Sequence, residues 1–256
     1  LGDLEGAVEY LRECLVLQRK KFGDFHGEVA ETLNLLGTCF HMLRNFGGSL
    51  ASFQESLSIR KLWFGERSPH VANTLYSIGI LYRDSGDFGN GMAVLKECLS
   101  IQQDSLGSGH GDCGSTFKVM GQVSYEMGDY CEALKLLQKA LVFEQENNVS
   151  GHVDDLVEIH RCLGLVLEKL ELHQDAVSHF EHCLSFEREN LGDNDLSLSE
   201  TMLSIGRNLK LLGNTKGALE WYRQSLTLKM DGIGEDASEV RDLVTEIKYL
   251  ESRLKF

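Results

Sequence analysis

The sequence predicts an all-α protein built as an α-solenoid, a superhelix of antiparallel helix pairs, and three observations support this. An aliphatic or Met residue followed by Gly recurs with glycine intervals of 42, 42, 43 and 42 residues, at Gly37, Gly79, Gly121, Gly164 and Gly206. A second small residue stands twelve positions after each glycine, as Ser49, Gly91, Ala133, Ala176 and Ala218. Between these positions, apolar residues recur at steps of three and four, which is helical spacing.

Each period contains two helices. Apolar residues around Gly79 share one helical face, and after the break "DSGDFGN" the same spacing returns from Met92 to Ile101. The turn Gly86-Asp87 separates the two helices, and pairs such as Phe64-Gly65 close the second helix. Because closely approaching helices need small side chains where they cross, we expect the two small-residue rows to form the crossing points. Another small-residue row is expected to pack seven positions further on, at Cys14, Ser56, Cys98, Ala140, Cys183 and Ser225.

The period divides residues 1–256 into a single solenoid. We expect a half repeat at 1–25, full repeats at approximately 26–67, 68–109, 110–152, 153–194 and 195–236, and a terminal helix at 237–256. The terminal helix can dock through an apolar stripe that includes Val240, Leu243 and Ile247, and its other side is polar, as in an end cap. Because the chain starts within a repeat and without Met, we expect it to be a fragment of a longer protein.

Composition and charge exclude several classes of function. The formal charge is −14, from 25 Lys and Arg against 39 Asp and Glu, which repels nucleic acid and anionic membrane surfaces. No stretch has the length and apolarity of a membrane span or a signal peptide. The seven cysteines contain no Cys-x-x-Cys pair, which favours a soluble protein of the reducing cytoplasm.

Two patterns resemble sites of enzymes or cofactors, and neither predicts one. The segment "GHGDCG" (109–114) has the glycine spacing of a dinucleotide-binding loop, but a helical run precedes it and its counterparts one and two periods earlier lack the glycines. His173, His179, His182 and Cys183 resemble a zinc cluster, but Cys183 belongs to a packing row. We therefore predict no catalysis, no metal and no cofactor.

The repeats resemble the tetratricopeptide repeat. Its signature of Gly and an aromatic residue on the first helix, with a small residue on the second, is carried by Gly79, Tyr82 and Gly91. The 42-residue period and the segments "HGEVAETLNLLG" (26–37) and "SPHVANTLYSIG" (68–79) are similar to the repeats of kinesin light chain and related adaptor arrays. The aromatic position is lost at Ser124, Leu167 and Leu209.

In a superhelix of this kind the first helices line the concave side, which can form a groove for an extended peptide. The residues of the columns that do not face the second helix are candidates for peptide binding: Asn34, Asn73, Tyr76, Ile80, Arg83, Lys118, Gln122, Arg161, Leu165, Leu203, Arg207 and Lys210. Amide side chains can bond a peptide backbone, and the Tyr, Ile and Leu side chains offer apolar pockets. Lys118 and Arg161, in one column of adjacent repeats, are expected to bind an acidic side chain.

The sequence thus predicts a non-catalytic scaffold or adaptor that binds a protein or peptide partner with an acidic and hydrophobic segment. The alternative is a regulatory or structural array that packs against another domain of a longer chain, through its terminal helix or its acidic convex side. The oligomeric state is not predicted.

Overall fold

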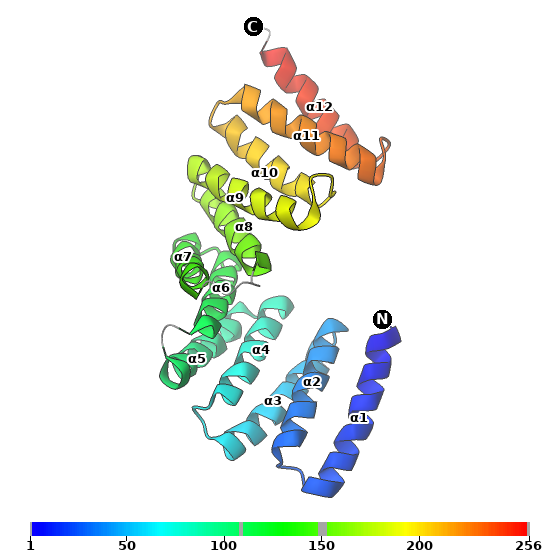
Figure 1. Ribbon diagram of the computed structural model, residues 1–256, viewed down its shortest axis with the longest axis vertical. Coiled ribbons are helices and arrows are strands. Elements are labelled where there is room, and N and C mark those ends of the chain that lie inside the picture. The colour runs from blue at the N-terminus through cyan, green and yellow to red at the C-terminus, as the bar shows by residue number, and fades with distance from the viewer. Residues whose placement is uncertain (1, 108–109, 148–152, 255–256) are drawn as a thin grey trace. The chain divides into compact units, whose positions relative to one another are not determined.

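The computed structural model describes residues 2–107, 110–147 and 153–254, and every regular element in these ranges is an α-helix (Figure 1). The helices are α1 (Gly2–Phe22), α2 (Gly27–Met42), α3 (Phe46–Phe64), α4 (Pro69–Ser85), α5 (Phe88–Leu106), α6 (Gly111–Glu126), α7 (Tyr130–Asn147), α8 (Val153–Lys169), α9 (His173–Leu191), α10 (Leu198–Leu211), α11 (Thr215–Ile233) and α12 (Ser238–Arg253). The prediction of an all-α helix-pair protein is confirmed. None of the helices in the described ranges is long and apolar enough to cross a membrane.

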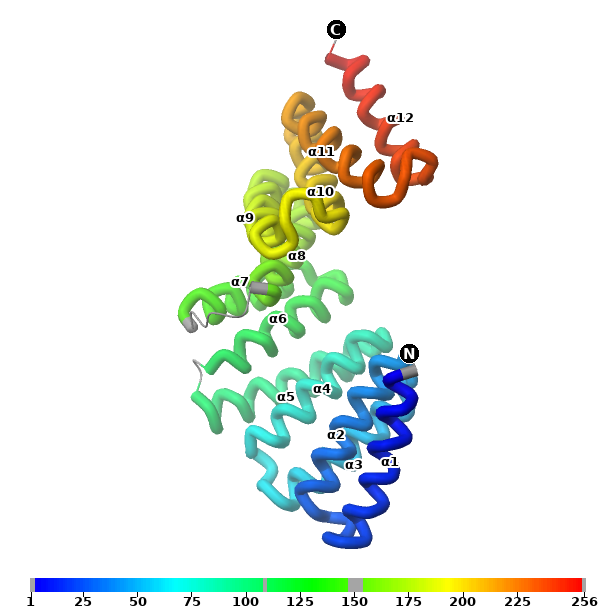
Figure 2. The backbone as a smooth tube through the Cα atoms, turned by 45° about the vertical axis from the view of Figure 1, so that its right-hand side comes forward, coloured from blue at the N-terminus to red at the C-terminus, as the bar shows by residue number. Residues whose placement is uncertain are grey.

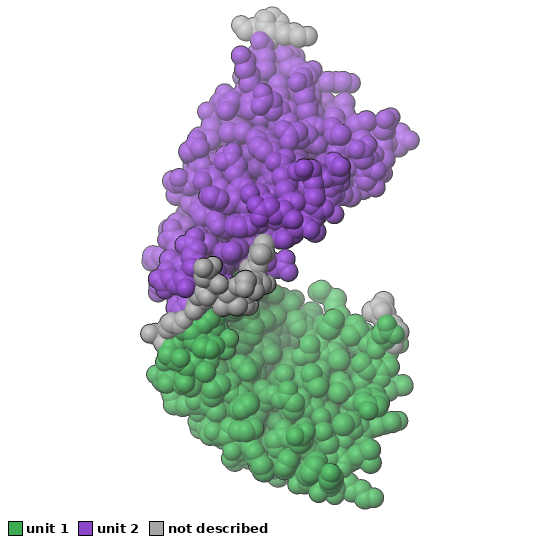
Figure 3. Space-filling view, in the orientation of Figure 1, with its two compact units in different colours: residues 1–129 green, residues 130–256 purple. Residues whose placement is uncertain are grey.

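The chain divides into two compact units (Figure 3). Unit 1 is Leu1–Asp129 and unit 2 is Tyr130–Phe256. In unit 1, α2 packs on α3 and α4 on α5, and α1, α3 and α5 each pack on the helix that follows (Figure 2). In unit 2, α8 pairs with α9 and α10 with α11, while α7, α9 and α11 each contact the next helix. Each unit therefore stacks helix pairs, and the repeat boundaries stay a prediction.

The turn between the paired helices is set by helix caps. The Asn45 and Asp87 side chains cap the second helices α3 and α5 by accepting the Gly48 and Asn90 amides, and the Ser68 hydroxyl caps the first helix α4 by accepting the Val71 amide. α4 ends at Gly86, whose φ of 83° lies in the left-handed region. At the corresponding positions of two other repeats, Arg44 and Glu171 adopt φ of 58° and 60°. These two residues carry a side chain in a conformation that glycine adopts more easily.

The first-helix glycines lie where a large side chain of the second helix crosses. A Cβ atom added to Gly37 would lie 2.7 Å from the Phe53 ring, and one added to Gly79 would lie 2.5 Å from Leu95. The small residue of the second helix contacts the glycine itself, since Ser49 Oγ donates to the Gly37 carbonyl at 2.8 Å. The crossing point predicted from small residues therefore also contains a large side chain, which only glycine leaves room for.

The third small-residue row fixes the paired helices by hydrogen bonds. Ser56 Oγ donates to the Ala30 carbonyl at 2.6 Å, Cys98 Sγ to Ala72 at 3.2 Å and Ser225 Oγ to Ser199 at 3.0 Å. Burial raises the pKa of Cys98 to about 12, so its thiol stays protonated. Cys98 and Cys183 are fully buried, as expected for packing residues.

Candidate functional site

The predicted groove residues all lie on first helices of the pairs. In unit 1 they lie on α2 (Asn34), α4 (Asn73, Tyr76, Ile80 and Arg83) and α6 (Lys118 and Gln122). In unit 2 they lie on α8 (Arg161 and Leu165) and α10 (Leu203, Arg207 and Lys210). Within unit 1, α4 also contacts α2 and α6, so its three first helices are neighbours.

Polar contacts link the first helices of unit 1. The Arg83 guanidinium on α4 donates to the Gln122 amide oxygen on α6, and its Nε donates to Asp84 at 2.8 Å. The other oxygen of Asp84 lies 2.8 Å from His41 Nε2 on α2. The oxygen of the Asn34 side chain is buried and has no hydrogen-bond partner within the described chain. This buried oxygen is therefore left without the hydrogen bond that such groups usually have.

The two cations that we expected to bind an acidic ligand are in different surroundings. Lys118 belongs to unit 1 and is buried. Arg161 belongs to unit 2, and its guanidinium donates to the Glu187 carboxylate at 2.7 Å. Burial lowers the pKa of Arg161, but the hydrogen bond to Glu187 raises it. The net shift in the pKa of Arg161 is upward. Lys118 is thus buried and Arg161 has an internal acidic partner, and the binding of an acidic ligand by these two residues stays a prediction.

A buried polar column on the second helices, which was not predicted from the sequence, contains the partner of Arg161. Eleven residues after each second-helix small residue stand Gln18, Arg60, Gln102, Glu144, Glu187 and Lys229. Arg60, Gln102, Glu187 and Lys229 are buried. Gln18 and Gln102 each accept a hydrogen bond at 2.8 Å from a first-helix threonine, Thr32 and Thr116. The repeat period could have revealed this column, because its members recur at the same position of every repeat although their residue types differ.

The cations of this column form ion pairs with exposed glutamates of the first helices. Arg60 donates to the Glu31 carboxylate, to Thr74 at 2.9 Å and to the His70 carbonyl at 3.0 Å. Lys229 Nζ lies 2.6 Å from Glu200 and 2.5 Å from Glu239. Burial lowers the pKa of Lys229, and the two carboxylates raise it by more, so the ammonium stays charged. Glu31 and Glu200 are thus neutralised from within the protein.

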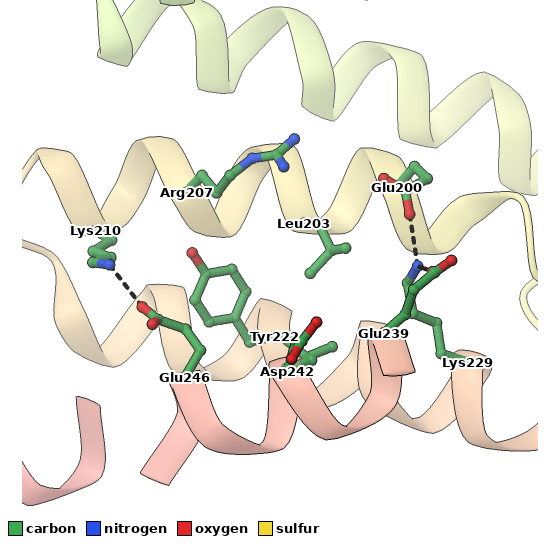
Figure 4. A pocket seen from close by; sticks show the side chains of 10 residues that line it. Glu200, Leu203, Arg207, Lys210, Tyr222, Lys229, Glu239, Asp242 and Glu246 are labelled. Atoms are coloured by element: carbon green, nitrogen blue, oxygen red, sulfur yellow. Dashed lines mark hydrogen bonds and ion pairs between the residues drawn. The ribbon is translucent and has the colours of Figure 1, made fainter. Parts of the chain in front are cut away.

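A pocket of about 480 Å³ opens between α10, α11 and α12 in unit 2 (Figure 4). Three predicted groove residues line it: Leu203, Arg207 and Lys210. Glu200 of α10 also lines it, and the remaining lining residues, which were not predicted as groove residues, come from α11 and the terminal helix: Tyr222, Lys229, Glu239, Asp242, Leu243 and Glu246. Lys210 Nζ lies 2.7 Å from Glu246 and closes one end, as the Lys229 pairs close the other.

Tyr222 lies between α10 and α12 in this pocket (Figure 4). Burial, with the nearby Glu246 charge, raises its pKa to about 12, so the hydroxyl stays protonated. Arg207 is exposed, donates to Ser204 Oγ at 2.9 Å and makes no ion pair in the part of the chain that the structure describes. The pocket thus combines apolar walls at Leu203 and Leu243, a phenol hydroxyl and an available guanidinium with the carboxylates of Glu200, Glu239, Asp242 and Glu246.

His160, His179 and His182 of unit 2 form a cluster, and His160 was not predicted from the sequence. His160 Nδ1 on α8 lies 3.0 Å from His179 Nδ1 on α9, and its ring centroid lies 5.0 Å from that of His182. Burial, with the two neighbouring histidines, lowers the pKa of His160 to about 4. His173 instead bonds Asn208 at 2.9 Å. Among the described residues, no group of three or more His, Cys, Asp or Glu side chains is arranged to hold a metal ion.

Comparisons with known proteins identify the repeat. The family profile of the tetratricopeptide repeat matches residues 1–62, 70–141 and 155–231. The sequence matches none of the curated proteins. Solved structures with a similar fold include BtubC (BKLC) from P. vanneervenii, with 16% identity, a TM-score of 0.72 and coverage of 90% of this chain and 91% of that one.

Two further structures have the same fold. A putative kinesin light chain with nearly identical TPR-like repeats from Podosopora anserina has 16% identity and a TM-score of 0.68, over 80% of this chain and 97% of that one. The apo form of RapI has 13% identity and a TM-score of 0.69, over 88% and 84% of the two chains. At these identities the likeness concerns the fold alone.

Proposed function

The chain belongs to the tetratricopeptide repeat family, whose fold is typical of protein-interaction scaffolds, and we propose that it is a non-catalytic adaptor that binds a partner peptide along its first helices. The observation that carries the proposal is the pocket between α10 and α12, because it lies between first helices of adjacent pairs and is lined by three residues of the predicted groove. An open, partly apolar pocket with a few directed polar groups is the usual form of a ligand subsite.

The acidic residue of the partner is proposed to dock on Arg207. Arg207 makes no ion pair within the described chain, whereas Arg161, Lys210 and Lys229 each hold an internal carboxylate. A guanidinium presents donors in a fork that matches a carboxylate. An apolar residue next to the acid then packs on Leu203 and Leu243, and the Tyr222 hydroxyl is available to the peptide backbone.

The remaining predicted residues are proposed as further peptide contacts on the first helices within each unit. Asn34, Asn73 and Gln122 supply amide groups, and Tyr76, Ile80, Leu165 and Leu203 supply apolar contacts. We also propose a cytoplasmic location, since none of the seven cysteines forms a disulfide in the structure and three of them are buried packing residues.

The test starts from peptides selected from a random library on the purified chain. Their affinity is then measured for the unmodified chain and for Arg207→Glu, which exchanges attraction for repulsion at an exposed site. The charge-matched control is Lys216→Glu, on the exposed side of α11. We expect Arg207→Glu to weaken acidic peptides at least about tenfold and Lys216→Glu to leave them unchanged. Equal affinities for both variants, or no selected peptide, would refute the proposal.

A further inference from the structure

The pocket between α10 and α12 contains an internal carboxylate beside the residue that we propose to bind an acid. Glu246 of α12 lies 2.7 Å from Lys210 Nζ, and both residues line the pocket. Arg207 is three residues before Lys210 on α10, so the two cations lie on the same face of the helix. An acidic ligand bound to Arg207 therefore meets a neighbouring cation that already holds a carboxylate of the chain.

The ion pair of Lys210 and Glu246 is accessible to solvent from both partners. Their side chains are 39% and 35% exposed. Lys229 is instead buried between Glu200 and Glu239, at 2.6 and 2.5 Å, and its release would leave a buried cation unpaired. Figure 4 shows these pairs at opposite ends of the pocket. Glu246 can therefore exchange Lys210 for water, while Lys229 keeps α12 joined to α10 and α11.

The charge of Glu246 also opposes an acidic ligand directly. Four carboxylates and three cations line the pocket, so the charge of its lining is negative before any ligand binds. Burial and the Glu246 charge raise the pKa of Tyr222, and the Arg207 charge lowers it. Because Glu246 and Arg207 both act on the same phenol, a carboxylate bound to Arg207 lies within the repulsion of Glu246.

We propose that Glu246 determines the charge specificity of this pocket by competing with the acidic group of the ligand for Lys210. The inference rests on the proposed function, since it requires an acidic peptide residue on Arg207. When the ligand binds, Glu246 turns to solvent, and Arg207 and Lys210 hold the ligand carboxylate together, with the Tyr222 hydroxyl as a further donor. A neutral ligand leaves the internal pair intact. Glu246 thus lowers the affinity for acidic ligands and not for neutral ones.

The test uses Glu246→Gln, which keeps the size of the side chain and removes its charge. The matched control is Glu251→Gln on the same helix, because Glu251 pairs with Arg223 at 2.6 Å and does not line the pocket. Each variant removes one negative charge, so effects of the net charge are the same in both. Affinities are measured for a library-selected acidic peptide and for the same peptide with its acid replaced by the amide. We expect Glu246→Gln to bind the acidic peptide at least about threefold more tightly and the amide peptide unchanged, and Glu251→Gln to bind both as the unmodified chain does.

A second substitution identifies the source of the gain. Lys210→Met in the Glu246→Gln chain should remove it, because the freed ammonium is what holds the ligand. A role of Glu246 in folding alone would change the affinity for both peptides alike and leave their ratio unaltered. The inference is wrong if Glu246→Gln and Glu251→Gln bind the acidic peptide equally, or if the gain survives Lys210→Met. Binding that does not weaken in Arg207→Glu is a different result, which refutes the proposed function and this inference with it.

Discussion

Units 1 and 2 have the same helix-pair packing but differ in how they bury polar side chains. In unit 1 the column on the second helices buries the cation Arg60 under an exposed Glu31, whereas unit 2 buries both the anion Glu187 under an exposed Arg161 and the cation Lys229 under an exposed Glu200. Four residues before the first-helix glycine, unit 1 has Leu33 and Leu75 where unit 2 has His160. The crossing glycines are common to both. Close packing of the helix backbones therefore requires glycine at the crossing positions. The neighbouring positions of the repeat accept different side chains, provided that each finds a partner.

The largest effect is expected at the crossing glycines. Gly206→Ala in unit 2 and Gly79→Ala in unit 1 place a Cβ against the Tyr222 ring and the Leu95 side chain, and each should lower the free energy of unfolding by about 1 to 3 kcal/mol. The loss at Gly206 should be larger, because a buried aromatic ring has less freedom to move than a Leu side chain. Lys248→Ala, at the same position of the period, should change little. Chemical denaturation measures all three, and equal losses at Gly206 and Lys248 would contradict the repeat register.

The second largest effect is expected where the partner of a buried charge is removed, and it should differ between Glu187 and Arg60. Arg161→Gln leaves the buried Glu187 without its cation, and we expect a loss of about 1 to 3 kcal/mol in the free energy of unfolding. Glu31→Gln should cost less, since the buried Arg60 keeps its bonds to Thr74 and the His70 carbonyl. The comparison fails if thermal denaturation shows the two variants to be equally stable.

A third difference is a dependence on pH in unit 2. The pKa of His160 is about 4 in the folded chain, from burial and the neighbouring His179 and His182, and 6.5 is its ordinary value. Between these values the unfolded chain binds the proton more readily, so stability falls as the pH drops. The loss contributed by His160 from pH 8 to pH 5 should be about 2 kcal/mol.

His160→Met, which introduces the residue found at position 202, should remove most of this dependence. Hydrogen exchange at both pH values distinguishes the units, and we expect faster exchange at low pH in α8 and α9 than in α4 and α5. An unchanged pH dependence in His160→Met would exclude this histidine as the cause.

The smallest effect concerns the left-handed turn residues. Glu171→Gly relieves a side chain at φ of 60° and should stabilise unit 2 by about 0.5 kcal/mol. Arg44→Gly in unit 1 should stabilise the chain by less, because it also removes the contact of the Arg44 guanidinium with the Phe46 ring, whose centroid lies 5.2 Å away. The reverse change, Gly213→Glu, should destabilise the chain. Melting temperatures in the opposite order would show that the turn conformation is not the source of strain.

The helices and their crossings were predictable from the sequence, because the glycine period and the three-four spacing record backbone packing directly. The buried polar column was not, since its members alternate between Gln, Arg, Glu and Lys, and such residues indicate a solvated face when read singly. Partners such as Glu187 for Arg161 and Asn208 for His173 depend on side-chain directions between helices. Only the α10 side of the pocket was predicted, because Tyr222, Asp242 and Glu246 come from α11 and α12, which lie outside the predicted groove.

Photo-cross-linking tests the central claim, a peptide site on the first helices, most directly. A library-selected peptide with a photoreactive group beside its acidic residue is irradiated on the chain, and the attachment sites are identified by mass spectrometry. The account predicts attachment to α10 and α12, around Leu203, Arg207 and Asp242. Attachment mainly to the outer sides of α9 and α11, around Glu181 or Glu220, would contradict it.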